Sequence, residues 1–154
     1  MGEVNSEAKP KRRSIWPHSS AGKVVLVGIA YFLIGYGSAL LDPFVPDQLR
    51  FPWRLTAWVL SGVTFAAHIA HEVFRLRNPP LKTASQAAAA VAIGAFLLAI
   101  GATTHAFLVQ SGTPRWRFFL ALVLWPIITA VPAFLVAFIA AAVLSRLPTR
   151  RVAE

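Results

Sequence analysis

Residues 24–41 carry the sequence VVLVGIAYFLIGYGSALL, an apolar run without a charged side chain. A helix needs about 20 mainly apolar residues to cross the hydrocarbon core of a bilayer, and this run is close to that length. Three further stretches have the same character, at about 55–74, 84–109 and 118–144. None of them alternates apolar and polar residues over a membrane strand's length of about ten positions. The sequence therefore predicts an all-α membrane protein with four transmembrane helices.

The composition of the chain supports this class. The 154 residues are 56% hydrophobic and only 14% charged, whereas soluble domains carry about 25% charged residues. This composition excludes a disordered chain and argues against a soluble domain. Cysteine is absent, which excludes disulfide bonds, thiolate metal sites and a cysteine nucleophile. No glycine-rich phosphate loop or nucleophilic serine motif occurs, so we expect no enzymatic activity and no cofactor.

Turn-forming residues separate the four apolar runs. The breaks fall at Asp42-Pro43, at Asn78-Pro79-Pro80 and at Ser111-Gly112-Thr113-Pro114, where proline and the residue before it disfavour helix. Short links place consecutive helices side by side and antiparallel. We therefore predict an up-down-up-down bundle over 21–147, flanked by a flexible basic tail at 1–20 and a short basic tail at 148–154.

Two sequence pairs hint at an internal repeat. Phe32-Leu33 recurs as Phe96-Leu97, and Trp53-Arg54 recurs as Trp116-Arg117. Both pairs fall at equivalent places in a two-helix unit, which is the pattern expected of two tandem helical hairpins. The alternative is that outer membrane interfaces attract tryptophan and arginine in any case.

The basic residues define an orientation. If both termini are cytoplasmic, all but four of the fifteen lysines and arginines lie on the cytoplasmic side, as the positive-inside rule requires. The four outer ones are Arg50, Arg54, Arg115 and Arg117. We therefore expect a multi-pass protein of a cell membrane, which in a bacterium would be the inner membrane. Its basic side should contact anionic lipids at the cytoplasmic face. No basic patch lies on a soluble domain, which argues against nucleic acid as a partner.

The second apolar run carries a polar stripe. Ser61, Thr64, His68, Glu72 and Arg75 follow one another at steps of three or four residues, which places them on one helical face. A polar face is costly against lipid, so it should point into the bundle. His68 and Glu72, one turn apart, are the arrangement expected of a proton relay. The alternative is that Glu72 only pairs with basic residues at the helix end, namely Arg75, Arg77 and Lys82.

The histidines do not predict a metal or haem site. The run from His68 to Glu72 is neither of the usual zinc-protease motifs. His105 lies near the outer end of the third run and His68 near the inner end of the second, so their depths differ by about 15 Å. One haem bridging both is therefore unfavourable. Thr104 and His105 form a candidate outer polar site, with hydrogen bonds to a neighbouring helix as the alternative.

Small residues and prolines predict the packing of the helices. Gly28 and Gly35 in the first run, and Gly94 and Gly101 in the third, allow close approach of helix backbones. Pro126 and Pro132 predict kinks in the fourth run. Asp47 is expected either to cap a short interfacial helix or to pair with Arg54.

The sequence leaves three functions open. The first is a non-enzymatic accessory or interaction subunit, either a homo-oligomer or the companion of a membrane protein partner. The second is a small proton-coupled transporter in which His68 and Glu72 act as the relay. The third, weaker alternative is a redox subunit that holds haem b.

Overall fold

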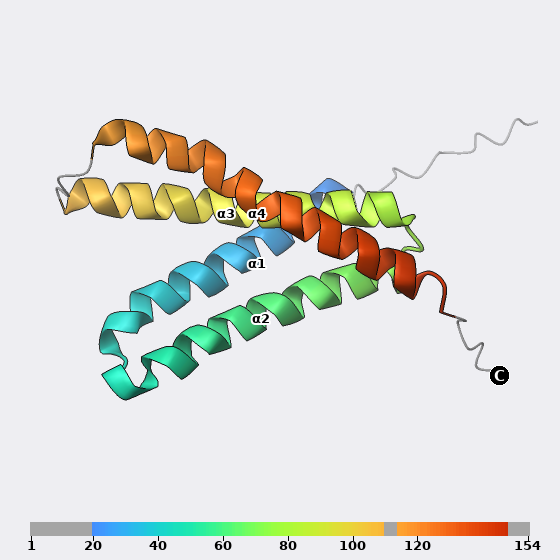
Figure 1. Ribbon diagram of the computed structural model, residues 1–154, viewed down its shortest axis with the longest axis horizontal. Helices are drawn as coiled ribbons and strands as arrows, with labels where there is room; N and C mark the ends of the chain where they lie inside the picture. Colours follow the sequence, from blue (N-terminus) through green and yellow to red (C-terminus); the bar gives the residue numbers. More distant parts are fainter. Residues whose placement is uncertain (1–19, 110–113, 148–154) are drawn as a thin grey trace, which may run out of the picture.

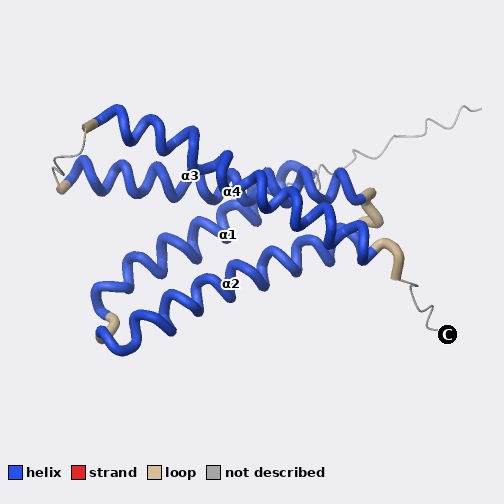
Figure 2. The backbone as a smooth tube through the Cα atoms, viewed as in Figure 1, coloured by secondary structure: helices blue, strands red, loops and turns tan. Residues whose placement is uncertain are grey.

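The computed structural model describes residues 20–109 and 114–147, and these residues form four long helices. The predicted tails lie outside the described residues except for Ser20, and so does most of the third connection. No strand occurs in the part of the chain that is described (Figure 2). The long helices are α1 (Ser20–Leu41), α2 (Arg50–Ala70), α3 (Pro80–Leu108) and α4 (Arg115–Leu144). The prediction of an all-α chain is confirmed.

Proline positions set several of the helix ends. Pro79 has extended backbone dihedrals and precedes Pro80, which occupies the first turn of α3, where a missing N–H costs nothing. Pro114 likewise precedes the first residue of α4. Between α1 and α2 the chain forms two short 3₁₀ turns, η1 (Asp42–Phe44) and η2 (Asp47–Leu49). After α2 it widens into a π-helical turn, η3 (His71–Arg75).

The four helices form two hairpins that meet at one end. α3 and α4 make the most extensive contact, α1 packs on α3, and α2 touches α3 and α4 only sparsely. Figure 1 shows the α1–α2 hairpin and the α3–α4 hairpin diverging toward their own connections and converging where α2 turns into α3. The arrangement is therefore a wedge between two hairpins, and a closed bundle is not confirmed.

Among the described helices, α1, α3 and α4 are long and apolar enough to cross a membrane. The spans run over Ala21–Phe44, Pro80–Leu108 and Arg115–Leu144. Helix α2, which covers most of the predicted span at 55–74, does not reach the same apolar character, because it has Arg50 and Arg54 in its first two turns and carries the polar stripe. The structure therefore supports a membrane protein with three strongly apolar helices.

The buried core is thin and built mainly from alanine. It lies at the converging end, where Ile69 and Val73 pack against four alanines that are fully buried: Ala84, Ala87, Ala137 and Ala141. The large apolar side chains point outward instead, with Leu26 70% and Trp58 78% exposed. This distribution is the opposite of a water-soluble fold and suits a lipid solvent.

Glycines bring α1 and α3 together. A Cβ added at Gly94 would lie 2.7 Å from Tyr31 Cβ and 3.0 Å from the carbonyl oxygen of Gly28, and one added at Gly28 would lie 2.7 Å from Ile93 Cγ2. Further along, Cβ atoms at the other two glycines would meet Leu98 at 2.9 Å (from Gly35) and Tyr36 at 3.2 Å (from Gly101). The backbones therefore approach as closely as small-residue helix pairs allow.

Helix α4 continues through both of its prolines. Pro126 and Pro132 lie inside one continuous helix, although each removes one backbone donor. Between them, Thr129 Oγ1 donates within the helix to the carbonyl oxygens of Trp125 (2.9 Å) and Pro126 (3.1 Å). Such back-bonding by threonine satisfies its hydroxyl without a partner helix.

Candidate functional site

The polar stripe of α2 is divided by depth. His68 is 7% exposed and Glu72 2% exposed, and Ser61 and Thr64 are half-buried. Arg75 is exposed, which corrects the prediction that it shares the buried face. The reason is the π-helical turn at His71–Arg75: a π turn holds one more residue than an α turn, so the spacing that aligns Ser61 to Glu72 no longer applies at Arg75.

The end of α2 covers the Glu72 carboxylate with an amide. Asn78 Nδ2 donates to Glu72 Oε2, and the backbone N–H of Asn78 donates to the carbonyl oxygen of Glu72 at 3.1 Å. Leu76 N–H donates to the His71 carbonyl oxygen at 3.3 Å. Between these bonds, Arg77 adopts a left-handed backbone with φ 51°. The reversal after the helix therefore folds Asn78 back over Glu72, much as a helix C-terminal cap does.

The expected basic partners of Glu72 are replaced by Asn78. No ion pair joins Glu72 to Arg75, Arg77 or Lys82 within residues 20–109, so the predicted pairing at the helix end is corrected. From the sequence, Asn78 is predicted only to form part of a turn. The signal that could have identified it is an asparagine six residues after a carboxylate, at a reversal forced by two prolines.

A groove between α1 and α2 runs along the buried histidine. This α1–α2 groove has a volume of about 560 Å³ and is lined by Lys23, Leu26 and Val27 from α1, and by Val63, Thr64, Ala67, His68, His71 and Glu72 from α2 and η3. His68 Nε2 is buried and has no hydrogen-bond partner in the described part of the chain. Because buried polar atoms are nearly always paired, this nitrogen is open to a partner from outside the described residues.

A second hollow lies between the hairpins. This interhairpin cleft of about 540 Å³ is lined by residues of all four helices, with Tyr31, Trp58 and Trp125 as its aromatic members. Small side chains form much of the rest: Gly35, Ser38, Ser61, Gly62, Ala95 and Ala133. The hydroxyl of Tyr31 is buried and unpaired among the described residues. Sequence periodicity gave no sign of this cleft, because its lining comes from helices far apart in the chain.

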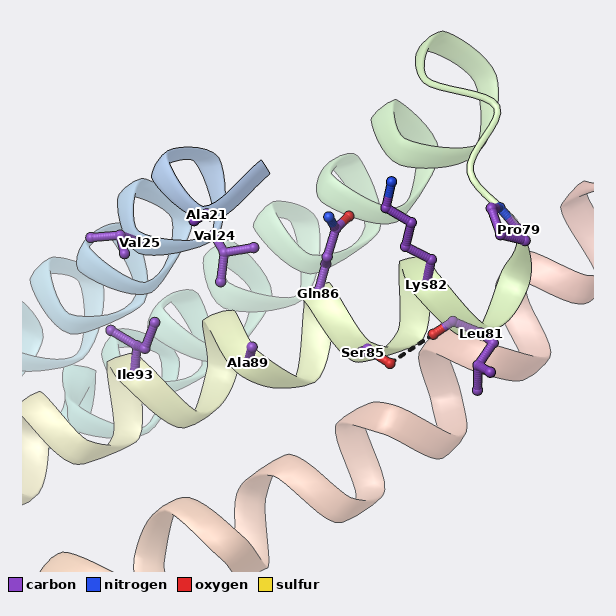
Figure 3. A pocket seen from close by; sticks show the side chains of 10 residues that line it. All are labelled: Ala21, Val24, Val25, Pro79, Leu81, Lys82, Ser85, Gln86, Ala89 and Ile93. Carbon is purple, nitrogen blue, oxygen red and sulfur yellow. Dashed lines mark hydrogen bonds between the residues drawn. The ribbon is translucent and has the colours of Figure 1, made fainter. Parts of the chain in front are cut away.

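A third hollow, the α1–α3 groove, lies beside the start of α3 and measures about 590 Å³. Figure 3 shows Lys82 and Gln86 extending in the same direction from α3, with Val24 and Ile93 among the apolar residues around them. Ser85 Oγ is already used, since it donates to the Leu81 carbonyl oxygen at 2.8 Å. Gln86 Oε1, an acceptor, is buried here and has no hydrogen-bond partner among the described residues.

The connection between α1 and α2 is tied by polar contacts. Arg54 donates to both carboxylate oxygens of Asp42, at 3.2 Å from Nε and 3.0 Å from Nη2. Asp47 pairs with Arg50 at 3.1 Å, so the predicted pairing of Asp47 with Arg54 is wrong. Asp47 is also not a cap, because it begins η2 and no side-chain cap bond forms there.

A further tie at this end uses a tryptophan. Trp53 Nε1 donates to the Ser38 carbonyl oxygen at 3.1 Å, joining the start of α2 to the end of α1. In the second hairpin the matching pair is Trp116-Arg117. Arg117 lies 5.6 Å from the ring centre of Trp116 and makes a cation–π contact with it, whereas Arg54 pairs with Asp42. The two Trp-Arg pairs therefore occupy similar places but make different contacts.

The outer polar residues of α3 bond within their own helix. Thr104 Oγ1 donates to the Ile100 carbonyl oxygen at 2.9 Å, and Thr103 Oγ1 to that of Ala99 at 2.7 Å. These bonds correct the expectation that the threonines reach across to a neighbouring helix. His105 is exposed. No cluster of three metal-ligating side chains occurs within the described ranges.

No protein-family model, no curated protein and no solved structure matches this chain.

Proposed function

We propose that this chain is a non-enzymatic, multi-pass membrane protein that spans the bilayer four times, with both termini on the cytoplasmic side. The apolar exterior supports a fourth crossing by α2, since Trp58, Val59 and Val63 are more than half exposed while His68 and Glu72 are turned inward. A helix with an apolar outer face and a buried polar face is tolerated in lipid.

Topology can be tested directly because the chain has no native cysteine. Single-cysteine variants Gln48→Cys and Ser111→Cys are expected to react with a membrane-impermeant maleimide in intact cells. Ser6→Cys is expected to react only after permeabilisation. Labelling of Ser6→Cys from outside, or protection of either connection, would reject the proposed orientation.

We further propose that the protein acts as an interaction subunit, with the interhairpin cleft as the seat of a transmembrane helix from a partner or a second copy. The observation that carries this proposal is the open cleft itself, lined by small residues of all four helices where the two hairpins diverge. Helices associate in membranes by close packing on small residues. A cleft of this kind therefore offers a complementary surface to another apolar helix.

Two glycines provide a matched test. A Cβ at Gly62 or at Gly37 would meet no atom within 4 Å, but only Gly62 lines the cleft. We expect Gly62→Phe to block the cleft. This variant should then no longer form the oligomer, or no longer retain the companion protein, that is obtained with the parent chain in mild detergent. Gly37→Phe should preserve this assembly. Equal assembly of both variants would show that the cleft is not the binding surface.

A second candidate function is proton-coupled transport through His68 and Glu72. The observation that favours it is the burial of both side chains on one face of the continuous helix formed by α2 and η3, with His68 Nε2 unpaired among the described residues. In proteoliposomes with an internal pH dye, a proton flux should disappear in the variant His68→Ala. The flux should persist in the control Thr104→Val, because the Thr104 hydroxyl donates to the Ile100 carbonyl oxygen of its own helix. Flux that survives in His68→Ala would remove this candidate.

A further inference from the structure

The α1–α2 groove has a polar end and an apolar end. Lys23 and His71 lie at the polar end, near the start of α1 and the close of α2, whereas Leu26, Val27 and Val63 lie deeper along the helices. Leu26 is 70% and Val63 61% exposed. An amphiphile with a small charged head and an extended chain has this same division along its length.

The charges in the groove favour an anionic head. Lys23 forms no ion pair with any described residue, and His71 is exposed beside it on the facing helix. Glu72 also lines the groove, but its side chain is 2% exposed and accepts a hydrogen bond from Asn78. The carboxylate is therefore mostly buried, and the more accessible basic side chains of the groove are Lys23 and His71.

The unpaired nitrogen of His68 gives an independent indication of a ligand. The side chain lines the groove between the polar and apolar ends. Its Nε2 is buried and has no hydrogen-bond partner among the described residues. An imidazole nitrogen that carries a proton can donate to an ester carbonyl oxygen. The α1–α3 groove differs in this respect, because its unpaired atom, Gln86 Oε1, is an acceptor and would repel a phosphate.

We propose that the α1–α2 groove is a binding site for one anionic glycerophospholipid. Lys23 and His71 bind the phosphate, His68 Nε2 donates to an ester oxygen of the glycerol region, and an acyl chain lies along Leu26, Val27 and Val63. This site is separate from the interhairpin cleft, so the proposal does not depend on the interaction function. It also differs from general attraction of a basic chain to an anionic surface, because it requires particular residues on two helices.

The test measures lipid retained on the protein. The full-length chain is reconstituted into phosphatidylcholine nanodiscs that contain phosphatidylglycerol as a minor component, extracted in mild detergent and examined by native mass spectrometry. We expect one phosphatidylglycerol to remain bound in preference to phosphatidylcholine. Lys23→Gln should weaken retention about fivefold, the ratio expected for the attraction of one basic residue to an anionic surface, and Lys23→Arg should restore it.

Lys82→Gln is the matched control. Lys82 also lies in the first turn of a helix but lines the α1–α3 groove, so this variant should retain the lipid. Val63→Trp tests the apolar end without changing charge, and it should reduce retention because the added ring occupies the path of the acyl chain. Circular dichroism and gel filtration establish that each variant is folded before retention is measured.

Three results would overturn the proposal. Equal losses in Lys23→Gln and Lys82→Gln would indicate general electrostatic attraction. Equal retention of phosphatidylcholine and phosphatidylglycerol would show that the head charge is not recognised. Displacement of the lipid by soluble glycerol phosphate would show that the groove binds a free phosphate ester and that Leu26, Val27 and Val63 take no part.

Discussion

The contact between α1 and α3 makes a sharp prediction for Gly94→Ala. The new methyl carbon would lie 2.7 Å from Tyr31 Cβ and 3.0 Å from the Gly28 carbonyl oxygen, whereas two carbons are at their optimum at about 3.5–4.0 Å. Neither neighbour can swing away, because one atom is attached to the backbone and the other belongs to it. The two helices must therefore move apart by on the order of 1 Å.

The magnitude follows from two opposing effects. Overpacking of a tight interface costs about 1–3 kcal/mol, while replacing a helical glycine by alanine stabilises by about 0.5–1 kcal/mol. We expect Gly94→Ala to lower the free energy of unfolding by about 1–2 kcal/mol. Gly37→Ala is the control, since its Cβ meets nothing within 4 Å, and it should raise that free energy by about 0.5–1 kcal/mol.

The assay is reversible unfolding in mixed micelles with increasing dodecyl sulfate, followed by tryptophan fluorescence. Trp58 and Trp125 line the interhairpin cleft, so their emission reports on the separation of the two hairpins. The two glycine variants are predicted to change the free energy of unfolding in opposite directions. If Gly94→Ala were as stable as Gly37→Ala, the close approach of α1 and α3 would be refuted.

Three further substitutions test the ends of α2. Asn78→Ala removes the side-chain donor to the buried carboxylate of Glu72 and should destabilise by about 1–3 kcal/mol in the same unfolding assay; an unchanged value would mean that the amide is dispensable. Arg77→Gly should stabilise by about 0.5–1 kcal/mol, because φ is 51° there and glycine adopts this region freely; any loss of stability would contradict this. Trp53→Phe removes the hydrogen bond to the Ser38 carbonyl oxygen and should lower the free energy of unfolding by about 1 kcal/mol. An unchanged free energy would mean that water replaces the indole as the donor.

Much of the helical content could be predicted from the sequence, because long apolar runs and proline breaks are local signals. Pro80 and Pro114 lie within one position of the observed starts of α3 and α4. The splaying of the two hairpins could not be predicted in this way. It depends on the distance between α1 and α3, which the glycines at 28 and 94 allow to be short. That distance is a property of two helices that are distant in the chain.

The site was predictable only as far as helical periodicity held. The spacing of His68 and Glu72 places both on the face that is buried. It failed at Arg75, because a π turn adds a residue and nothing in the run HEVFR announces one. The cover of Glu72 by Asn78 and the position of Lys23 across the groove arise from the chain reversal and from packing, and single-helix patterns carry no information about either.

Helix α1 crosses α3 most closely at Gly28 and Gly94, and beyond that point the ends of longer side chains, those of Leu98 and Tyr36, fill the space between the two helices. The part of α1 beyond the crossing can therefore change its tilt against α3. Ser38 lies about 15 Å beyond Gly28 at a rise of 1.5 Å per residue, and a tilt of about 10° at the crossing would displace it by about 3 Å. Membrane helices change tilt when bilayer thickness changes. Lipid thickness would consequently set the width of the wedge, giving a small protein with no soluble sensor domain among its described residues a mechanical response to its surroundings.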